Sequence, residues 1–419
     1  MIKKYFYVLL AAIILLCACT TSVQTPRESL PTETVNTDTT GYVVESPMKY
    51  PDYTFQTQPT VEDLRKTAIR AMKDLLSVQW STAKNISYNK SGPISEKRFQ
   101  HKADTTYAGT PYSNGSTGIF QFFEYYDQET GRFWYPGTST ELSRNLGNSC
   151  ADSLIWAYDT VCTSIKGGYY PATMVYANGY YPVGDYVYNF EINTYNKLPT
   201  GIIIEQNGRN VIMDSYAKVL MGDALVSTSD NHAMMAIENA HIVMGEDGNI
   251  DTAESYIMIQ DQRGGSGQGF YEHMENGKLI QYSGRTSAKY TFDELYKKTY
   301  LPVRPAEFMD ADNYQFATVS AIKEKCNSIE ELMEVTVSSN YPIAVINIII
   351  CDDYGNETIM ERVIFGGNKK EGPPREYKLD DLDSLKDYHS GKYANSGSCI
   401  KVEVVVSTGE RFTPVTADY

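Results

Sequence analysis

Apolar positions recur at helical spacing in two stretches of the chain. Between residues 60 and 76 they return every three or four residues, behind acidic residues that suit a first helical turn. The stretch 146–165 shows the same spacing, and Asn148 or Ser149 is suited to cap its start. We predict a helix over each stretch and place the beginning of the folded part at Thr60.

Most other apolar residues form short segments of β type, separated by turn signals. These segments are 186–192, 201–205, 210–221, 223–228, 232–244, 255–261, 329–339, 343–350, 357–365 and 399–408. Pro302 and Pro305 stiffen a connection, which favours a second domain boundary within the segment 301–309. The pattern predicts an α+β fold, with a mixed domain over 60–304 and a small all-β sandwich of immunoglobulin type over 305–419.

The first residues follow a different pattern. Lys3 and Lys4 precede an apolar run that is too short to span a bilayer and that ends at Cys19. This segment resembles a bacterial lipoprotein signal, which implies removal of residues 1–18, lipidation of Cys19 and an anchor on the extracytoplasmic side of the cell envelope. An ordinary secretory peptide is the alternative. The run 19–59 is rich in Thr, Ser, Pro and Glu, so we interpret it as a disordered tether.

Composition narrows the class of partner. The 419 residues include 37 Lys and Arg against 52 Asp and Glu, a formal net charge of −15. Neutralising phosphates requires a basic surface, so a nucleic-acid partner is not expected. Neither a His-Glu-x-x-His motif nor a paired Cys-x-x-Cys motif occurs, and we predict no metal and no cofactor. The 34 tyrosines suit half-buried strands or surfaces that contact sugars and peptides.

The folded part contains an odd number of cysteines: Cys150, Cys162, Cys326, Cys351 and Cys399. An exported protein with an odd number must leave one of them unpaired. Cys150 is the candidate nucleophile, because it lies at the amino end of the second predicted helix, where unpaired N–H groups favour a thiolate. Cys162 falls on the apolar face of that helix and is interpreted as a core thiol or disulfide partner. Cys351 and Cys399 lie in predicted strands and are able to pair with each other.

A thiolate hydrolase needs an imidazole to protonate the leaving group and a polar group to orient the ring. Among the five histidines, His232 stands at the first position of a predicted strand, whereas the other contexts better suit a solvated residue or a strand face. The next predicted strand ends in Gln260, Asp261 and Gln262. Alternation puts the two glutamines on one face and Asp261 on the other, and the sequence leaves open which face meets His232.

The order of these segments resembles that of the NlpC-type and CHAP-type papain-like cysteine peptidases and amidases. Cys150 at a helix start is followed by Gly222-Asp223 and by His232 opening a strand. Upstream, the segment 107–115, YAGTPYSNG, is similar to the family's Y-x-G-x-P-Y segment. The resemblance covers roughly residues 60–300 and implies a papain-like domain of helices and an antiparallel sheet.

The resemblance also implies roles for individual residues. Cys150 would be the nucleophile, His232 the general base and acid, and Asp261, or its neighbour Gln260 or Gln262, the residue that orients the ring. The backbone N–H of Cys150 would be one donor to the oxyanion.

The resemblance also implies a role for two tyrosines upstream of the nucleophile. Tyr112, and less so Tyr107, would stand near the thiol and the oxyanion site. Three departures from the family pattern are visible. Ser149 stands where the family usually has Asp or Gln, and Ala151-Asp152 follow the cysteine where the family has Ser-Gly. The long interval before the histidine includes the Tyr-rich stretch 167–196. We interpret that stretch as an insertion that builds either the substrate cleft or the core.

Together these features predict an exported, lipid-anchored cysteine hydrolase that cleaves an amide bond in the peptide part of peptidoglycan through a thioester on Cys150. One alternative is a non-catalytic surface binding or adhesion protein on the same scaffold. Another is a thiol acyltransferase or transpeptidase, which would pass the acyl group to an amine in place of water.

Overall fold

The computed structural model describes twelve parts of the chain: 50–88, 99–113, 118–135, 146–165, 174, 179–187, 199–263, 271–352, 354–365, 373–383, 385–386 and 399–418. The predicted signal 1–18 and the part 19–49 of the predicted tether, which includes Cys19, lie outside these parts. Most of the stretch 167–196 and the glycine-rich loop after Arg263 do so as well. None of the described helices is both long and apolar enough to cross a membrane.

The helix α2 (Val61–Ser77) confirms the first helical prediction. Its N-cap Thr60 accepts a hydrogen bond from the backbone of Asp63, and the Asp63 carboxylate accepts one from the Thr60 N–H at 3.0 Å. This reciprocal capping box satisfies backbone donors that the first helical turn leaves unpaired. The apolar face of the helix, including Leu64 and Met72, is completely buried.

The packed part of the chain begins before Thr60, although its composition suggested a tether up to residue 59. Tyr53 is 1% exposed and belongs to the same apolar core as α2. Its hydroxyl donates a hydrogen bond of 2.8 Å to the Asp74 carboxylate, and its N–H bonds to the Thr408 carbonyl. A polar, proline-containing stretch can therefore pack against the core through one or two aromatic side chains. The average composition of the stretch does not reveal such single residues.

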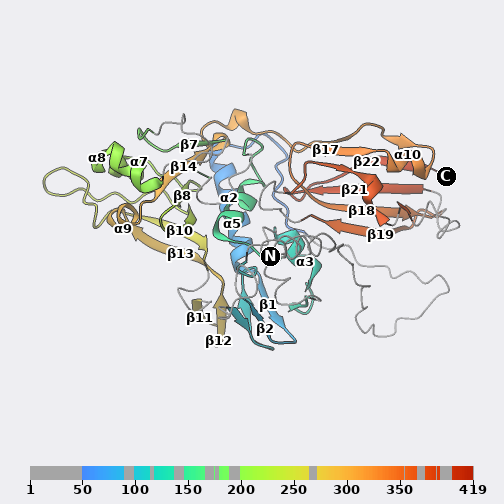
Figure 1. The fold of residues 1–419 in the computed structure, drawn as a ribbon, viewed down its shortest axis with the longest axis horizontal. Coiled ribbons are helices and arrows are strands. Elements are labelled where there is room, and N and C mark those ends of the chain that lie inside the picture. Colours follow the sequence, from blue (N-terminus) through green and yellow to red (C-terminus); the bar gives the residue numbers. More distant parts are fainter. Residues whose placement is uncertain are drawn as a thin grey trace, which may run out of the picture. The chain divides into compact units, whose positions relative to one another are not determined.

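A six-stranded antiparallel sheet with the order β13-β10-β9-β8-β14-β7 carries the candidate site (Figure 1). Its strands are β7 (Tyr180–Pro182), β8 (Ala224–Ser227), β9 (His232–Ala236), β10 (Tyr256–Gln262), β13 (Gly284–Thr291) and β14 (Leu301–Pro305). The helix α2 and the second predicted helix, α5 (Cys150–Tyr158), contact each other and the strand β10. These elements share one large apolar core.

Two predicted β segments are helices instead. Residues 201–205 lie in α7 (Thr200–Asn207), and most of 210–221 forms α8 (Arg209–Ala217). The isoleucines and the valine in these segments have only a weak preference for strands, and tertiary packing overrides it. The short helix α9 (Phe292–Lys297) follows β13.

A second six-stranded sheet has the order β11-β12-β4-β1-β6-β5. Its members are β1 (Gln79–Thr82), β4 (Tyr107–Ala108), β5 (Tyr126–Asp127), β6 (Arg132–Phe133), β11 (Tyr271–Glu275) and β12 (Lys278–Tyr282). The pair β2 (Ile86–Tyr88) and β3 (Phe99–His101) and the helix α3 (Ile119–Glu124) belong to the same part of the chain. Hydrophobic patterning did not indicate these strands, several of which are only two residues long.

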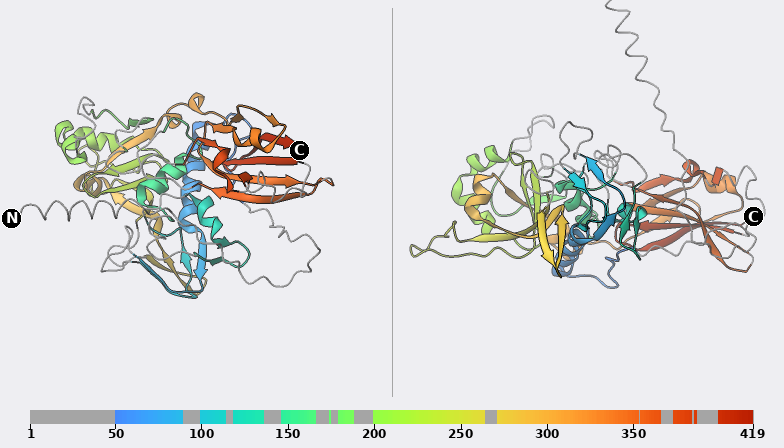
Figure 2. Two further views of the ribbon diagram at one scale, coloured as in Figure 1. Left: turned by 45° about the vertical axis from the view of Figure 1, so that its right-hand side comes forward. Right: turned by 90° about the horizontal axis from the view of Figure 1, so that it is seen from below.

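The C-terminal part forms two further sheets, coloured orange to red in Figure 2. One has the order β16-β22-β21-β18-β19 and the other β15-β17-β20. Their bounds are β15 (Val319–Ala321), β16 (Lys325–Cys326), β17 (Thr336–Ser339), β18 (Ile343–Cys351), β19 (Glu357–Ile364), β20 (Glu376–Lys378), β21 (Cys399–Val406) and β22 (Arg411–Asp418).

Both C-terminal sheets contribute side chains to one apolar core, for example Val337 from β17 and Ile348 from β18. The segment 329–339, predicted as a strand throughout, starts as a short helix, α10 (Ile329–Met333), because Ser328 caps it. Helices and sheets thus coexist in the described part, and the mixed α+β class is confirmed.

Candidate active site

Cys150 occupies the first position of α5, as the sequence predicted. The N-cap Ser149 has extended backbone, and the Asp152 carboxylate accepts hydrogen bonds from the Ser149 N–H at 3.1 Å and from its hydroxyl at 2.5 Å. These bonds fix the start of the helix, so the Cys150 side chain and N–H have a defined direction. The side chain is 3% exposed.

The helix α5 ends at Tyr158, one to two turns before the predicted end at residue 165. Cys162 therefore lies beyond the helix, where it is completely buried. Burial, together with the nearby Glu307 carboxylate, raises the pKa of the Cys162 thiol well above its ordinary value. A thiol in such surroundings stays protonated, which suits a core residue and not a nucleophile.

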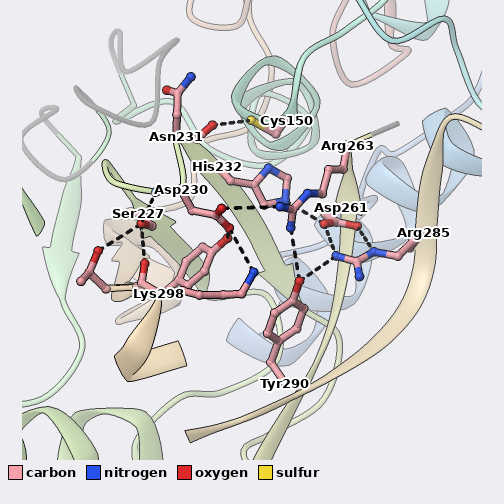
Figure 3. Close-up of polar contacts among 12 residues, drawn as sticks. Cys150, Ser227, Asp230, Asn231, His232, Asp261, Arg263, Arg285, Tyr290 and Lys298 are labelled. Carbon is pink, nitrogen blue, oxygen red and sulfur yellow. Dashed lines mark hydrogen bonds and ion pairs between the residues drawn. The ribbon is translucent and has the colours of Figure 1, made fainter. Parts of the chain in front are cut away.

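His232 begins β9 and lies beside Asp261 of β10 (Figure 3). The ring Nε2 of His232 donates a hydrogen bond of 2.7 Å to Oδ2 of Asp261. Asp261 is completely buried and also accepts two hydrogen bonds from Arg285, from Nε at 2.8 Å and from Nη2 at 2.5 Å. The carboxylate therefore holds the ring while it is itself held by a fork of two guanidinium donors.

The thiol of Cys150 and the imidazole of His232 lie close enough for the charge of each to act on the other. Because Asp261 engages Nε2, Nδ1 is the ring nitrogen left available to the sulfur. In Figure 3 the His232 ring lies between the sulfur atom and the Asp261 carboxylate. The structure thus brings together a thiol, an imidazole and a carboxylate from α5, β9 and β10.

The pKa values of this cluster favour an ion pair. Burial acts to raise the pKa of Cys150, but the interactions with His232, chiefly with its positive charge, outweigh burial and lower that pKa below its ordinary value. Burial acts to lower the pKa of His232, but the Cys150 thiolate and Asp261 raise it to about 9. Near neutral pH these shifts favour a thiolate beside an imidazolium.

Asp261 supplies the permanent negative charge of the cluster. Burial alone would raise its pKa, but hydrogen bonds from Arg285 and His232 and their positive charges lower it to about 2. The carboxylate therefore stays ionised throughout the neutral range and acts only as an acceptor.

Gln260 and Gln262, the other candidates for the orienting role, lie on the opposite face of β10 from Asp261. The amide of Gln260 donates to the Ile69 carbonyl of α2 at 3.0 Å. The amide of Gln262 donates to the Thr110 carbonyl at 2.8 Å and to the Ser283 hydroxyl at 3.1 Å. Both glutamines therefore connect β10 to neighbouring segments, and neither contacts His232 through these bonds.

The segment that contains Tyr112 lies along the chain that leads to the nucleophile. Tyr112 forms a parallel bridge with Asn148, and the Asn148 N–H donates to the Pro111 carbonyl at 3.0 Å. The Thr110 hydroxyl donates to the Asn148 side-chain oxygen at 3.1 Å. The Tyr112 ring is 6% exposed and packs against Phe99.

Tyr107 is the other tyrosine for which a role near the thiol was predicted. Its ring packs against Trp80 with the centroids 5.0 Å apart, and it is 1% exposed. Its hydroxyl accepts a hydrogen bond of 2.5 Å from the Lys102 N–H and contacts the Gln100 carbonyl at 3.4 Å. These contacts place the Tyr107 hydroxyl against the backbone of residues 100–102.

Several residues of the site were not predicted. Arg285 stands directly opposite Asp261 in the antiparallel register of β10 and β13, a pairing that no local pattern reveals. Asn231 has a φ of +47°, in the left-handed region, and its carbonyl oxygen lies 4.0 Å from the Cys150 sulfur. Asn is among the few residue types that tolerate this backbone region. An Asn in a tight turn directly before His232 was therefore the sequence feature that could have identified Asn231.

Further charged side chains surround the ring of His232. Asp230 accepts a hydrogen bond of 2.6 Å from the Tyr300 hydroxyl and lies 3.5 Å from Arg263 and 3.7 Å from Lys298. Arg263 and Arg285 both donate to the hydroxyl of Tyr290, at 3.3 Å and 3.2 Å. The network joins the ends of β10 and β13 around the candidate site.

In the parts of the chain that the structure describes, no group of three or more His, Cys, Asp or Glu side chains is arranged to hold a metal ion. Comparison with known proteins returns no family model, no curated protein and no solved structure that matches the chain. The geometry of the site therefore indicates its chemistry. It combines the Cys150 thiol at the start of a helix, the adjacent imidazole of His232 and the buried carboxylate of Asp261.

Proposed function

We propose that the protein is a cysteine hydrolase with Cys150 as nucleophile, His232 as general acid and base, and Asp261 as the residue that orients the ring. The observation that carries the proposal is the hydrogen bond of 2.7 Å from His232 to the buried Asp261, with the Cys150 thiol next to the ring at the start of α5. The opposite pKa shifts of the thiol and the imidazole are those that a nucleophile and its base require.

The reaction follows from the positions of these groups. The Cys150 thiolate attacks the carbonyl carbon of an amide, and the backbone N–H of Cys150 at the start of α5 donates to the developing oxyanion. His232 gives its proton to the leaving amine, and the acyl group remains on sulfur as a thioester. His232, now neutral, takes a proton from water, which attacks the thioester and releases the acid and the thiolate.

Arg285 has a positioning role in this scheme. Its two bonds to Asp261 fix the carboxylate and, together with His232, lower its pKa, so that Asp261 holds the imidazole and does not take the proton itself. A neutral acid at this position would lose the attraction that favours the imidazolium.

The finer fold assignment belongs to the same proposal. A papain-like arrangement is supported by a nucleophile at a helix start and a base at the start of a neighbouring antiparallel strand, with the carboxylate on the next strand. An immunoglobulin-like sandwich for the C-terminal part is supported by two sheets that contribute to one apolar core.

The substrate we propose is an amide bond in the peptide part of peptidoglycan. Its support is the resemblance to the NlpC-type and CHAP-type enzymes, together with the predicted lipoprotein signal ending at Cys19, which would hold the enzyme beside that polymer. Lipid anchoring would also offset the net charge of −15, which is unfavourable for adsorption to an anionic wall.

Digestion of purified muropeptides tests this function. The full chain is incubated with a muropeptide mixture in ¹⁸O-labelled water, and the products are identified by mass spectrometry. We expect products with a new amine and a new carboxyl group that carries ¹⁸O, and we expect none with Cys150→Ala. As the control, His241→Ala, which removes an exposed histidine paired with Glu238, should retain activity.

Two outcomes would contradict the hydrolase assignment. Products joined to an added amine, without ¹⁸O, would identify an acyltransferase or transpeptidase. Binding of muropeptides without any turnover, in a chain whose Cys150 is reactive, would favour the surface binding protein.

A further inference from the structure

Two cysteines of the C-terminal part face each other across a pair of antiparallel strands. Cys351 is the last residue of β18 and Cys399 the first of β21, and the register pairs them directly. Directly opposite residues in antiparallel strands have Cα atoms about 4.5–5.5 Å apart. A disulfide requires a Cα separation of about 4.4–6.8 Å, so the register satisfies this condition without backbone movement.

The two thiols also act on each other. Burial, together with the neighbouring Cys399, raises the pKa of Cys351 to about 12. Cys351 is 5% exposed, whereas Cys399 is only half-buried. Lys401, two residues along β21 on the same face, carries a positive charge that acts on both thiols.

The other described cysteines have different surroundings. Cys326 pairs with Ala417, Cys162 lies next to Glu307, and Cys150 belongs to the candidate active site. Across the described strands, the register places no other two cysteines opposite each other.

We propose that Cys351 and Cys399 form a disulfide bond that joins the ends of two strands in the C-terminal sheet. The bond closes the segment 352–398 into a loop, which limits the freedom of the unfolded chain and thereby stabilises the fold. Three thiols then remain: Cys150 of the candidate active site, and Cys162 and Cys326, which are completely buried.

The oxidant is the disulfide of a thiol oxidoreductase or of glutathione. The more exposed Cys399, as a thiolate, attacks a sulfur atom of that disulfide, which gives a mixed disulfide and releases one thiolate. The Cys351 thiolate then attacks the Cys399 sulfur, which forms the new bond and releases the second thiolate. The two electrons reduce the oxidant's disulfide, and the two protons of the cysteine thiols pass to the released thiolates or to solvent.

Peptide mapping of the full chain in glutathione redox buffers tests the proposal. Free thiols are blocked with N-ethylmaleimide, and the unreduced protein is digested and analysed by mass spectrometry. We expect a linked peptide that contains Cys351 and Cys399, lighter by two hydrogen atoms than the sum of its parts, and we expect dithiothreitol to remove it. Labelling of both thiols in the most oxidising buffer, or linkage of either to another cysteine, would overturn the proposal.

A thermal melt provides a second readout, independent of the mapping. Oxidation should raise Tm of the wild-type chain by several degrees, and this rise should disappear in Cys399→Ser, where the half-buried partner is replaced. Cys326→Ser is the matched control and should keep the rise. A rise in Tm that persists in Cys399→Ser would contradict the assignment. If a variant fails to fold, peptide mapping of the wild-type chain still tests the proposal.

Discussion

Neutralising Asp261 and Arg285 in separate variants should move the pKa of His232 in opposite directions. An oxygen of Asp261 lies 2.7 Å from the ring, and Arg285 binds the same carboxylate from its other side. Asp261→Asn removes an attraction for the imidazolium, so the pKa of His232 should fall. Arg285→Gln removes a repulsion and leaves the carboxylate ionised at neutral pH, so the pKa of His232 should rise.

The magnitude follows from the shift that His232 already shows. Its pKa stands at about 9 against a reference of 6.5, a difference equivalent to about 3 kcal/mol. This is the net result of burial, which lowers the pKa, and of Cys150 and Asp261, which raise it. An opposite charge within about 4–6 Å shifts a pKa by about 1–3, so loss of the Asp261 charge should lower the pKa of His232 by about 1 or more. The effect of Arg285→Gln should be smaller, because its guanidinium lies farther from the ring than the carboxylate does.

The assay is a pH titration of the full chain labelled with ¹⁵N in its histidine side chains. Only five histidines are present, and the signal of His232 is identified by its absence in His232→Gln. Glu331→Gln, which neutralises an exposed carboxylate in α10, is the control and should leave the His232 titration unchanged. Shifts in the same direction for Asp261→Asn and Arg285→Gln would refute the reasoning, since general loosening of the site moves both variants alike.

Three further predictions concern stability. Asp223→Ala should destabilise the chain by about 3–5 kcal/mol, because it leaves the buried Arg65 and the partly buried Arg304 without their shared carboxylate. Urea denaturation measures this loss, and an unchanged midpoint of unfolding would contradict the prediction. Ser149→Ala should cost about 1 kcal/mol through loss of the α5 N-cap, and calorimetry that detects no change in Tm would argue against the cap. The pKa of Asp261 is about 2, against an ordinary value of 3.8. This difference contributes about 2 kcal/mol to the free energy of unfolding above pH 4, and the contribution is lost as the pH falls through 2. The stability difference between wild type and Asp261→Asn should therefore shrink over that range, and a constant difference would contradict the assignment.

Local sequence signals predicted the elements that carry the nucleophile and the base. The capped, amphipathic stretch before Ser77 and the polar cap before Cys150 both led to helices, because capping and periodicity act within a few residues. The strands that begin at His232 and end at Gln262 were predicted from short apolar runs bounded by turns. Local signals failed over 201–221, where Ile-rich helices resemble buried strands in sequence.

Long-range pairing explains what the sequence left open. Alternation separated Asp261 from the two glutamines, but only the packing of β9 beside β10 shows which face meets His232. Arg285 was missed because its partner is 24 residues away along the chain and is set by the register of two strands. The catalytic roles of these residues stay predictions.

Alkylation of Cys150 tests the central claim most directly. The full chain is treated with iodoacetamide over a range of pH, and the rate of labelling at Cys150 is followed by peptide mapping, for wild type, His232→Ala and the control His241→Ala. A thiolate beside an imidazolium should react rapidly at about pH 6, where an ordinary thiol is protonated, and this reactivity should be lost in His232→Ala and kept in the control. Slow labelling of Cys150 at that pH, with or without His232, would contradict the account.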